Sequence, residues 1–391
     1  MSSVDAPLGR DATSPEDAPP QEPAGLYVHI PFCITRCGYC DFNAYAGLDH
    51  LMPSYVRALM READLLSPEW AGTSFASVFL GGGTPTTIDP VDLDGLLSHL
   101  RLRFDILADA EITIEANPDT VDEFSLRRIR EAGYARLSMG AQSFDASVLR
   151  ALERIHRPEA ARAALRAARA AGYDNVNLDL IYGASGESLD SWSMTLREGI
   201  DLQPEHISAY ALTIEPATPL GRKVGAGETD PPDGDAQAEM FLQACDALRG
   251  AGYVHYEVSN WAKPGYECRH NLGYWRRRSY AGLGAGAHGF RRNRRWWNIR
   301  PPEAYMDAIG SGSSAVAGEE TLAASDAYLE EVFLRLRIME GIPESWAPEG
   351  SIDPLVGAGL LFSEHGSLLP TERGMLVLNH LVLELTADQM A

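Results

Sequence analysis

Cysteine is scarce in this sequence, and long apolar runs are missing from it. Only 5 of the 391 residues are cysteine, too few for the disulfide framework of a secreted protein, which predicts a reducing compartment. No apolar run approaches the roughly 20 residues of a membrane-spanning helix. The start of the chain also lacks the basic segment and apolar core of a signal peptide. We therefore expect a cytoplasmic protein with no integral membrane segment.

Positive charge is scarce as well. The 33 Lys and Arg are outnumbered by 55 Asp and Glu, for a formal net charge of -22, and such a chain repels phosphate backbones at long range. We therefore expect no nucleic-acid partner. The exception is the stretch 270–300, where eight arginines occur without any acidic residue. It predicts either a site for an anionic ligand or an arginine face that is solvated or lies between domains.

After a first segment rich in proline and acids, strand-like runs alternate regularly with helical ones. Six such strands, with a helical pattern in each gap between them, predict right-handed βαβ units and a parallel sheet. We therefore expect an α/β fold that is a partial (β/α)6 version of the TIM barrel, with its chemistry at the C-terminal ends of the strands. The predicted strands are 26–30, 77–81, 111–116, 135–141, 175–182 and 206–214, and the predicted helices lie near 51–66, 90–103, 123–132, 158–171 and 188–201.

The pattern divides the chain into four parts. Residues 1–24 hold five prolines, five acids and no aromatic residue, and this composition predicts a disordered tail. Residues 25–260 are expected to form the barrel and its last flanking elements. Residues 261–320 are a connecting region dense in tryptophan, arginine and glycine, and residues 321–391 read as a small α-rich C-terminal domain with a turn at 363–370.

Unusual residues follow the predicted strands, so they are expected to gather at one rim of the barrel. Each of them alone is equally compatible with a tight turn, a cap or a surface residue. In chain order they are Cys33, Cys37 and Cys40 after the first strand, Gly81 to Thr84 after the second, Glu115 and Asn117 at the third, Gln142 at the fourth and Asp179 in the fifth.

Three of the five cysteines lie in one short run, CITRCGYC at 33–40. Thiolates are soft ligands that hold zinc or iron-sulfur clusters. A structural zinc site needs a fourth protein ligand, and neither His29 nor His50 falls at a zinc-finger spacing. Three thiolates suit a four-iron cluster with one iron left open, while zinc and a purely structural loop remain the alternatives.

The pattern CxxxCxxC with an aromatic residue before the last cysteine resembles the signature of the radical S-adenosylmethionine (radical SAM) superfamily. The resemblance implies a radical SAM barrel that carries a [4Fe-4S] cluster on Cys33, Cys37 and Cys40, with SAM bound at the open iron. It also implies a glycine-rich SAM-binding turn in GGGTPT at 81–86. The cofactor-binding residues that it suggests are Tyr27, Gly82, Gly83, Thr84, Glu115, Gln142, Arg154 and Asp179.

The runs YVHIPFC, GGGTPT, EANP, GAQSF and DLIYG together resemble the oxygen-independent coproporphyrinogen oxidase family over most of residues 25–385. The decarboxylating branch of that family has a further cysteine two positions after the third, where this chain has Phe42. Conversely, HNLGYW at 270–275 is similar to a motif of the heme chaperone branch. The resemblance therefore implies a heme chaperone without oxidase activity, and the coproporphyrinogen III oxidase is the alternative. A radical SAM enzyme acting on tRNA is disfavoured by the negative charge.

Within this motif the resemblance implies that His270 offers an imidazole nitrogen to heme iron. It further implies that Asn271, Tyr274 and Trp275 contact the heme and that neighbouring arginines pair with its propionates. Without that context, His270 reads as a structural histidine. The expected partners are heme and acceptor hemoproteins, including respiratory ones, whose loading would bring transient peripheral membrane contact. A homodimer is compatible with the sequence.

Overall fold

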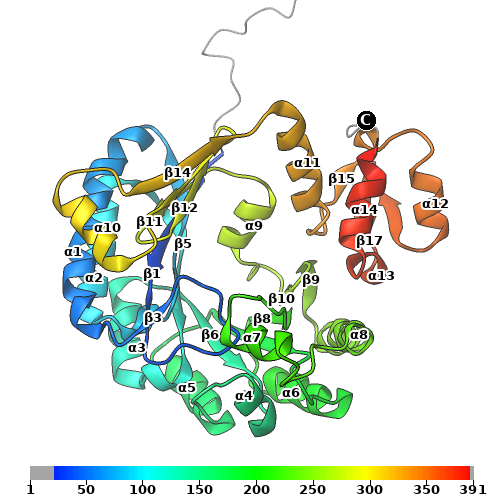
Figure 1. Ribbon diagram of the computed structural model, residues 1–391, viewed down its shortest axis with the longest axis horizontal. Helices are drawn as coiled ribbons and strands as arrows, with labels where there is room; N and C mark the ends of the chain where they lie inside the picture. The colour runs from blue at the N-terminus through cyan, green and yellow to red at the C-terminus, as the bar shows by residue number, and fades with distance from the viewer. Residues whose placement is uncertain (1–21, 388–391) are drawn as a thin grey trace, which may run out of the picture.

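Six parallel strands form the centre of the fold, and each pairs with the next along the chain. The computed structural model describes residues 22–387, so the predicted tail lies outside the described residues except for its last three. The strands are β1 (Ala24–Ile30), β4 (Ser74–Gly82), β5 (Asp105–Ala116), β6 (Arg136–Gln142), β7 (Val176–Tyr182) and β8 (His206–Ala211). This arrangement confirms the predicted α/β class and the partial barrel (Figure 1).

The predicted helices cover the outside of the sheet. In the helix with the clearest sequence pattern, Pro158 occupies the first turn and the buried residues Ala161, Ala164, Leu165 and Ala168 follow at the spacing of one helical face. The five predicted helices are α1 (Met52–Leu66), α2 (Pro90–Arg103), α3 (Glu123–Ala132), α5 (Pro158–Ala170) and α6 (Leu189–Asp201). The structure adds the short helices α4 (Ala146–Ala151) and α7 (Pro219–Gly225).

The sheet continues beyond the six strands on both sides. Next to β8 it adds β10 (Asn260–Ala262), which is antiparallel to β8. Beyond it lies β9 (Val254–Glu257), which is antiparallel to β10. Next to β1 it adds the parallel β11 (Tyr280–Leu283), followed by the antiparallel β12 (His288–Arg291), β13 (Arg294–Asn298) and β14 (Val316–Thr321). Most of the arginine-rich stretch is therefore β-structure in the same sheet as the barrel, and the proposed boundary at residue 260 stays a prediction.

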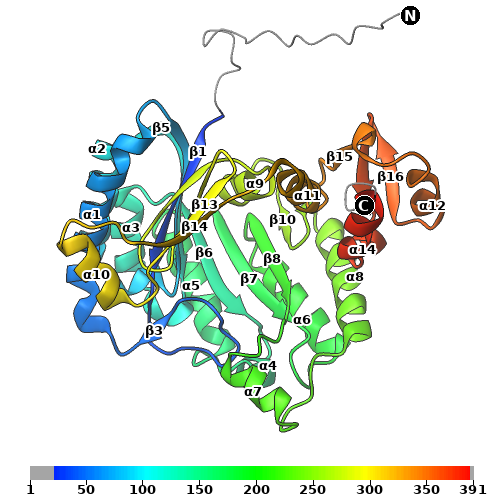
Figure 2. The same ribbon diagram turned by 45° about the horizontal axis from the view of Figure 1, so that its top comes forward.

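Helix α9 (Arg269–Trp275) carries the HNLGYW motif, and it lies between the barrel sheet and the C-terminal helices (Figure 2). The C-terminal region is mostly helical, with α11 (Ala324–Arg335), α12 (Ile352–Gly357), α13 (Glu372–Met375) and α14 (Leu378–Leu385). It also holds a small sheet of β15 (Ile342–Pro343), β16 (Leu361–Glu364) and β17 (Ser367–Pro370). The predicted turn is the hairpin between β16 and β17, where His365 and Gly366 both have positive φ.

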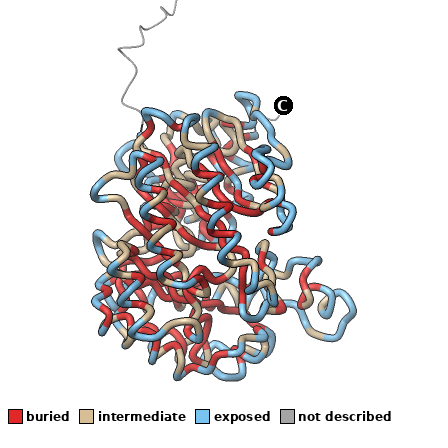
Figure 3. Tube along the Cα trace, turned by 90° about the vertical axis from the view of Figure 1, so that its left-hand side faces the viewer, coloured by how far each residue is buried: buried red, intermediate tan, exposed pale blue. Residues whose placement is uncertain are grey.

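The core lies between the sheet and the outer helices, where the buried segments gather in Figure 3. Strand residues that point outward, such as Leu137, Met139 and Leu178, are fully buried against the helices. The alternate residues point into the barrel and are polar: Asn177 Nδ2 donates to Asp179 at 2.9 Å and Asn177 Oδ1 lies 2.6 Å from His206 Nδ1. Such a polar interior is suited to a site rather than to packing alone. Within residues 22–387, none of the helices has the length and apolar character needed to cross a bilayer.

Candidate functional site

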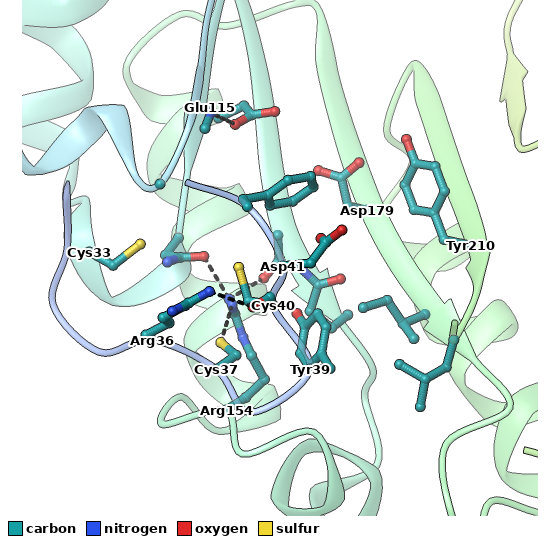
Figure 4. A pocket seen from close by; sticks show the side chains of 18 of the residues that line it. Cys33, Arg36, Cys37, Tyr39, Cys40, Asp41, Glu115, Arg154, Asp179 and Tyr210 are labelled. Atoms are coloured by element: carbon teal, nitrogen blue, oxygen red, sulfur yellow. Dashed lines mark hydrogen bonds between the residues drawn. The ribbon is translucent and has the colours of Figure 1, made fainter. Parts of the chain in front are cut away.

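The cysteine loop and the C-terminal ends of the parallel strands enclose a cavity of about 350 Å³. In Figure 4, Cys33, Cys37 and Cys40 lie on the loop at one side, and Glu115, Asp179 and Tyr210 lie on strands across from them. Tyr27 and Thr84 do not line this cavity, and neither does any residue of the HNLGYW motif. The predicted site residues on its wall are Cys33, Cys37, Cys40, Gly82, Gly83, Glu115, Gln142, Arg154 and Asp179.

The glycine-rich turn after β4 holds the start of the cysteine loop. Gly83 N donates to Ile30 O at 2.8 Å, and Thr84 N donates to Phe32 O at 2.7 Å. A Cβ on Gly83 would lie 2.5 Å from Phe32 O, so a larger residue would push the loop away. Glycine is therefore required here for the close approach of two backbone segments.

The three thiols fit an iron-sulfur cluster better than a single metal ion. Among residues 22–387, no group of three His, Cys, Asp or Glu side chains is arranged to hold one ion, whereas the thiolates of a cluster bind different irons. Burial raises the pKa of Cys33 to about 11, and it raises the pKa of Cys40 as well. Such thiols stay neutral unless a cation is bound beside them, and a coordinated metal deprotonates them. The loop therefore suits a metal cluster as its resident group.

Arg154 ties the cysteine loop to the strand ends. Its Nη1 donates to Cys37 Sγ at 3.3 Å, and its Nη2 donates to Asn117 Oδ1 at 2.6 Å and to Gly140 O at 3.0 Å. Asn117 in turn donates to Thr84 Oγ1 at 2.8 Å, and Thr84 lies 3.7 Å from Cys33 Sγ. One network of side chains thus supports the loop at Cys33 and at Cys37.

Two half-buried carboxyl groups face the loop across the cavity. Glu115 Oε2 accepts from Gly82 N at 3.0 Å, and burial, followed by the nearby Asp179, raises the pKa of Glu115 to about 8. Asp179 accepts from Ser138 and Asn177 at 2.9 Å, and burial raises its pKa too. A cationic group bound beside these carboxyls would draw them into their charged forms. With the Arg154 guanidinium on the other wall to pair with a carboxylate, the cavity can accept a ligand that carries both charges, as SAM does.

The HNLGYW helix is elsewhere, inside the opposite end of the barrel. His270 is 3% exposed, its Nδ1 lies 2.8 Å from Ser77 Oγ, and its Nε2 lies 2.9 Å from the Tyr274 hydroxyl. Burial lowers the pKa of His270 to about 3, so the ring is neutral. Both ring nitrogens therefore have partners, and the rings of Tyr27 and Phe79 stack against His270 toward the middle of the barrel.

The other residues of the motif lie on different sides of α9. Asn271 is half-buried, and Trp275 packs on a small cluster with Tyr256, Leu272 and Ile338. The Trp275 side chain also lies near the carboxyl group of Glu257, which is fully buried in β9. The motif thus anchors α9 to β9 and to the segment that follows α11 in the C-terminal region.

Five of the eight arginines in the stretch 270–300 form ion pairs with glutamates. Among the residues that the structure describes, these pairs are Arg276 with Glu340, Arg277 with Glu330, Arg278 with Glu22, Arg294 with Glu319, and Arg295 with Glu320 and Glu330. Arg277 also lies over the Phe290 ring, with its guanidinium carbon 4.8 Å from the ring centre. Each of these five arginines therefore pairs with a glutamate from another segment of the chain.

Glu257 predicts a pH dependence of stability. Burial raises its pKa from 4.5 to about 8, so between these values the unfolded chain releases a proton that the folded chain keeps. The contribution to the free energy of unfolding is therefore full below pH 4.5 and is lost as the pH rises toward 8. We expect Glu257→Gln, which has nearly the same shape and cannot ionise, to flatten part of this decline. Urea unfolding of the protein without cofactors at pH 5 and pH 8 tests it, and an equal decline in the variant would contradict it.

Comparison with known proteins places this site in a family. Residues 27–198 match the model of the radical SAM superfamily, whose members hold a [4Fe-4S] cluster and SAM. The heme chaperone HemW of Mycobacterium tuberculosis (strain ATCC 25618 / H37Rv) is 40% identical, over 93% of this chain and 95% of that protein. HemW of Escherichia coli (strain K12) is 37% identical, over 92% and 97%. The structure of coproporphyrinogen III oxidase (HemN) from Escherichia coli superposes with a TM-score of 0.81 at 25% identity, covering 94% of this chain and 91% of that one. The chain therefore belongs to the heme chaperone HemW family within the radical SAM superfamily.

Proposed function

We propose that this protein binds heme and passes it to acceptor hemoproteins, and that it carries a [4Fe-4S] cluster and SAM at the rim of its barrel. The observation that carries this proposal is the similarity, over nearly the whole chain, to proteins named heme chaperone. The HNLGYW motif on α9 supports it from within the chain. Respiratory hemoproteins are the proposed acceptors, and their loading would involve transient contact with a membrane surface. A homodimer is part of the same proposal.

The roles of the rim residues follow from their positions. Cys33, Cys37 and Cys40 are the proposed cluster ligands, and Arg154 and the Glu115–Asp179 pair are proposed to bind the charged groups of SAM. The cluster and SAM supply one-electron chemistry when bound. This cofactor site is proposed to be shaped by Gly82, Gly83, Thr84, Gln142 and Tyr27. Tyr27 does not line the cavity and is proposed to support its wall from behind.

His270, Asn271, Tyr274 and Trp275 are the proposed heme-binding residues of the motif. His270 Nε2 lies 2.9 Å from the Tyr274 hydroxyl, so it reaches a heme iron only when this hydrogen bond opens. Opening would free one nitrogen while the Ser77 hydroxyl still orients the ring at 2.8 Å from Nδ1. A ligating histidine is commonly oriented in this way through its other nitrogen.

An oxygen-independent coproporphyrinogen III oxidase is the second candidate. The close superposition on HemN of Escherichia coli, with a TM-score of 0.81, favours it. Against it stands Phe42, two positions after Cys40, where the oxidase branch is expected to have a cysteine. Phe42 lines the cavity and is 63% exposed, so this chain presents an apolar ring where a thiol would be.

The two candidates differ in what the reconstituted protein does. We expect protein with a rebuilt cluster and added SAM to bind heme, as seen by a Soret band that elutes with the protein. We expect no conversion of coproporphyrinogen III to protoporphyrinogen IX under anaerobic, reducing conditions. Steady turnover of coproporphyrinogen III in the absence of heme binding would contradict the proposed chaperone function and support the oxidase function.

A further inference from the structure

A row of polar side chains crosses the inside of the barrel from the cofactor cavity toward α9. The neighbouring strands β6, β7 and β8 each turn alternate residues inward, which places Ser138 beside Asn177 and Asn177 beside His206. All three side chains are buried. Ser138 and Asp179 line the cavity at the cysteine loop, whereas Asn177 and His206 do not. This interior row therefore reaches the wall of the cavity from behind.

The hydrogen bonds of the interior row all run toward Asp179. The Asn177 amide oxygen can only accept, so the proton of His206 is on Nδ1, which lies 2.6 Å from that oxygen. The Asn177 amide nitrogen then faces the other way and donates to Asp179 Oδ1 at 2.9 Å and to Ser138 Oγ at 2.8 Å. The Ser138 hydroxyl donates in turn to Asp179 Oδ2 at 2.9 Å. Asp179 thus receives two hydrogen bonds that depend on the orientation of the Asn177 amide.

His206 also connects the interior row to the segment before α9. Its Nε2 carries no proton and accepts from the Tyr256 hydroxyl at 2.7 Å, and that hydroxyl accepts from Cys268 N at 3.2 Å. Burial lowers the pKa of His206 well below its usual value, so the ring is neutral. His206 therefore acts on its neighbours through its hydrogen bonds and not through a charge.

The orientation of the Asn177 amide decides which form of Asp179 is favoured. With the amide reversed, its oxygen would face Asp179 and would favour the protonated acid. Reversal would also set the amide nitrogen against the Nδ1–H group of His206, donor against donor. The proton of His206 therefore selects the orientation that stabilises the charged form of Asp179.

We propose that His206 is a positioning residue for SAM, because its Nδ1–H group holds the Asn177 amide in the orientation that presents Asp179 as an acceptor in the cofactor cavity. This role rests on the proposed function, which places a charged group of SAM beside Asp179. Since His206 does not line the cavity, it acts there through Asn177.

Three other ionisable side chains lie near Asp179, and a substitution at position 206 leaves them in place. They are Glu115 on β5, Arg136 on β6 and Tyr210 on β8. Burial raises the pKa of Asp179, whereas its hydrogen bonds and the charge of Arg136 lower it. Loss of the hydrogen bonds should therefore raise the pKa of Asp179 further, and SAM should then need a higher pH to bind.

Calorimetric titration of SAM into the full-length protein with a reconstituted cluster, from about pH 6 to about pH 9, tests this role. His206→Asn puts an amide nitrogen in the place of Nδ1 and keeps the donor to Asn177. His206→Gln puts the amide in the place of Nε2 and keeps only the contact with Tyr256. We expect His206→Gln to raise the pH at which SAM affinity is half-maximal by at least ~0.5 pH units, and His206→Asn to keep the wild-type midpoint. His255→Gln is the matched control and should also keep it, because His255 stacks on Trp261 with ring centres 4.2 Å apart, on the face of β9 opposite Tyr256.

The results separate this role from the proposed function. SAM binding by the wild type with the same midpoint in His206→Gln would overturn the role and leave the proposed cofactor site standing. An equal loss of affinity at every pH in both variants at position 206 would also overturn it, because the histidine would then be structural only. Failure of the wild type to bind SAM would overturn the proposed cofactor site together with the role. Should His206→Gln not fold, Ser138→Ala replaces it, because it removes a donor to Asp179 and only one oxygen atom; an unchanged midpoint there would contradict the role.

Discussion

Replacing Cys33 with serine is expected to abolish the iron-sulfur absorbance of the reconstituted protein and to reduce its bound iron to background. The proposed cluster has only three protein ligands, so the loss of one thiolate leaves too few to hold four irons. Serine is close in size to cysteine, and the Thr84 hydroxyl 3.7 Å from Cys33 Sγ offers the new hydroxyl group a partner. The fold should therefore survive. Anaerobic reconstitution followed by absorbance, iron analysis and electron paramagnetic resonance measures the effect.

Cys245→Ser is the matched control for this experiment. Cys245 is 1% exposed in α8 (Gly234–Gly250) and does not line the cavity at the loop, so its replacement should leave the iron content unchanged. Heme binding by Cys33→Ser should persist, because none of the proposed heme-binding residues of α9 lines the cluster cavity. A full complement of four irons in Cys33→Ser would refute the three-thiolate assignment.

The barrel could be predicted from the sequence because its signals are local. Each parallel strand is a short apolar run, and each outer helix shows one apolar face, as Ala161, Ala164 and Leu165 do in α5. The added strands could not be found in this way. In β12 and β13, arginines and tryptophans interrupt any simple alternation, and the hairpin turn at Arg292 and Asn293 has positive φ without a glycine. Its partner β14 is more than fifteen residues further along the chain.

The cluster loop could also be predicted from the sequence. The side chains that hold this loop in place, and the glutamates that pair with the arginines, could not. Three cysteines within eight residues can be read directly. The contact of Arg154 with Cys37 joins residues 117 positions apart and exists only once the barrel has closed. Likewise Arg277 and Arg295 meet Glu330 on α11, more than thirty residues away. Tyr210 was missed because a tyrosine in a strand gives no sign of whether it faces a cavity.

Side chains inside the barrel connect the end that holds the HNLGYW helix with the end that holds the cysteine loop. From Ser77 and His270 at one end, aromatic rings of Tyr27 and Phe79 lead toward Glu115 and the glycine turn at the other. The Tyr27 hydroxyl lies 2.9 Å from His29 Nδ1, and His29 Nε2 lies 2.9 Å from Asn43 O after the cysteine loop. A continuous row of packed side chains therefore joins α9 to the base of the cysteine loop.

His270→Ala is expected to weaken heme binding by at least ~10-fold, equivalent to about 1.4 kcal/mol, while the cluster absorbance persists. The change removes the proposed iron ligand, but it also leaves the hydroxyls of Ser77 and Tyr274 without their partner. Each unsatisfied buried group costs about 1–3 kcal/mol, so the stability of the variant must be measured beside its affinity. Added imidazole should restore the Soret band if the lost nitrogen was bound to iron.

Tyr274→Phe separates ligation from a structural role. It breaks the same 2.9 Å hydrogen bond from the other side and leaves His270 Nε2 free. If His270 binds the iron, this variant should hold heme as tightly as the wild type or more tightly, since the bond that competes with the iron is gone. If His270 only fixes α9 against β4, both variants should lower stability and heme affinity together, and imidazole should rescue neither. That second outcome would move the iron ligand to another residue.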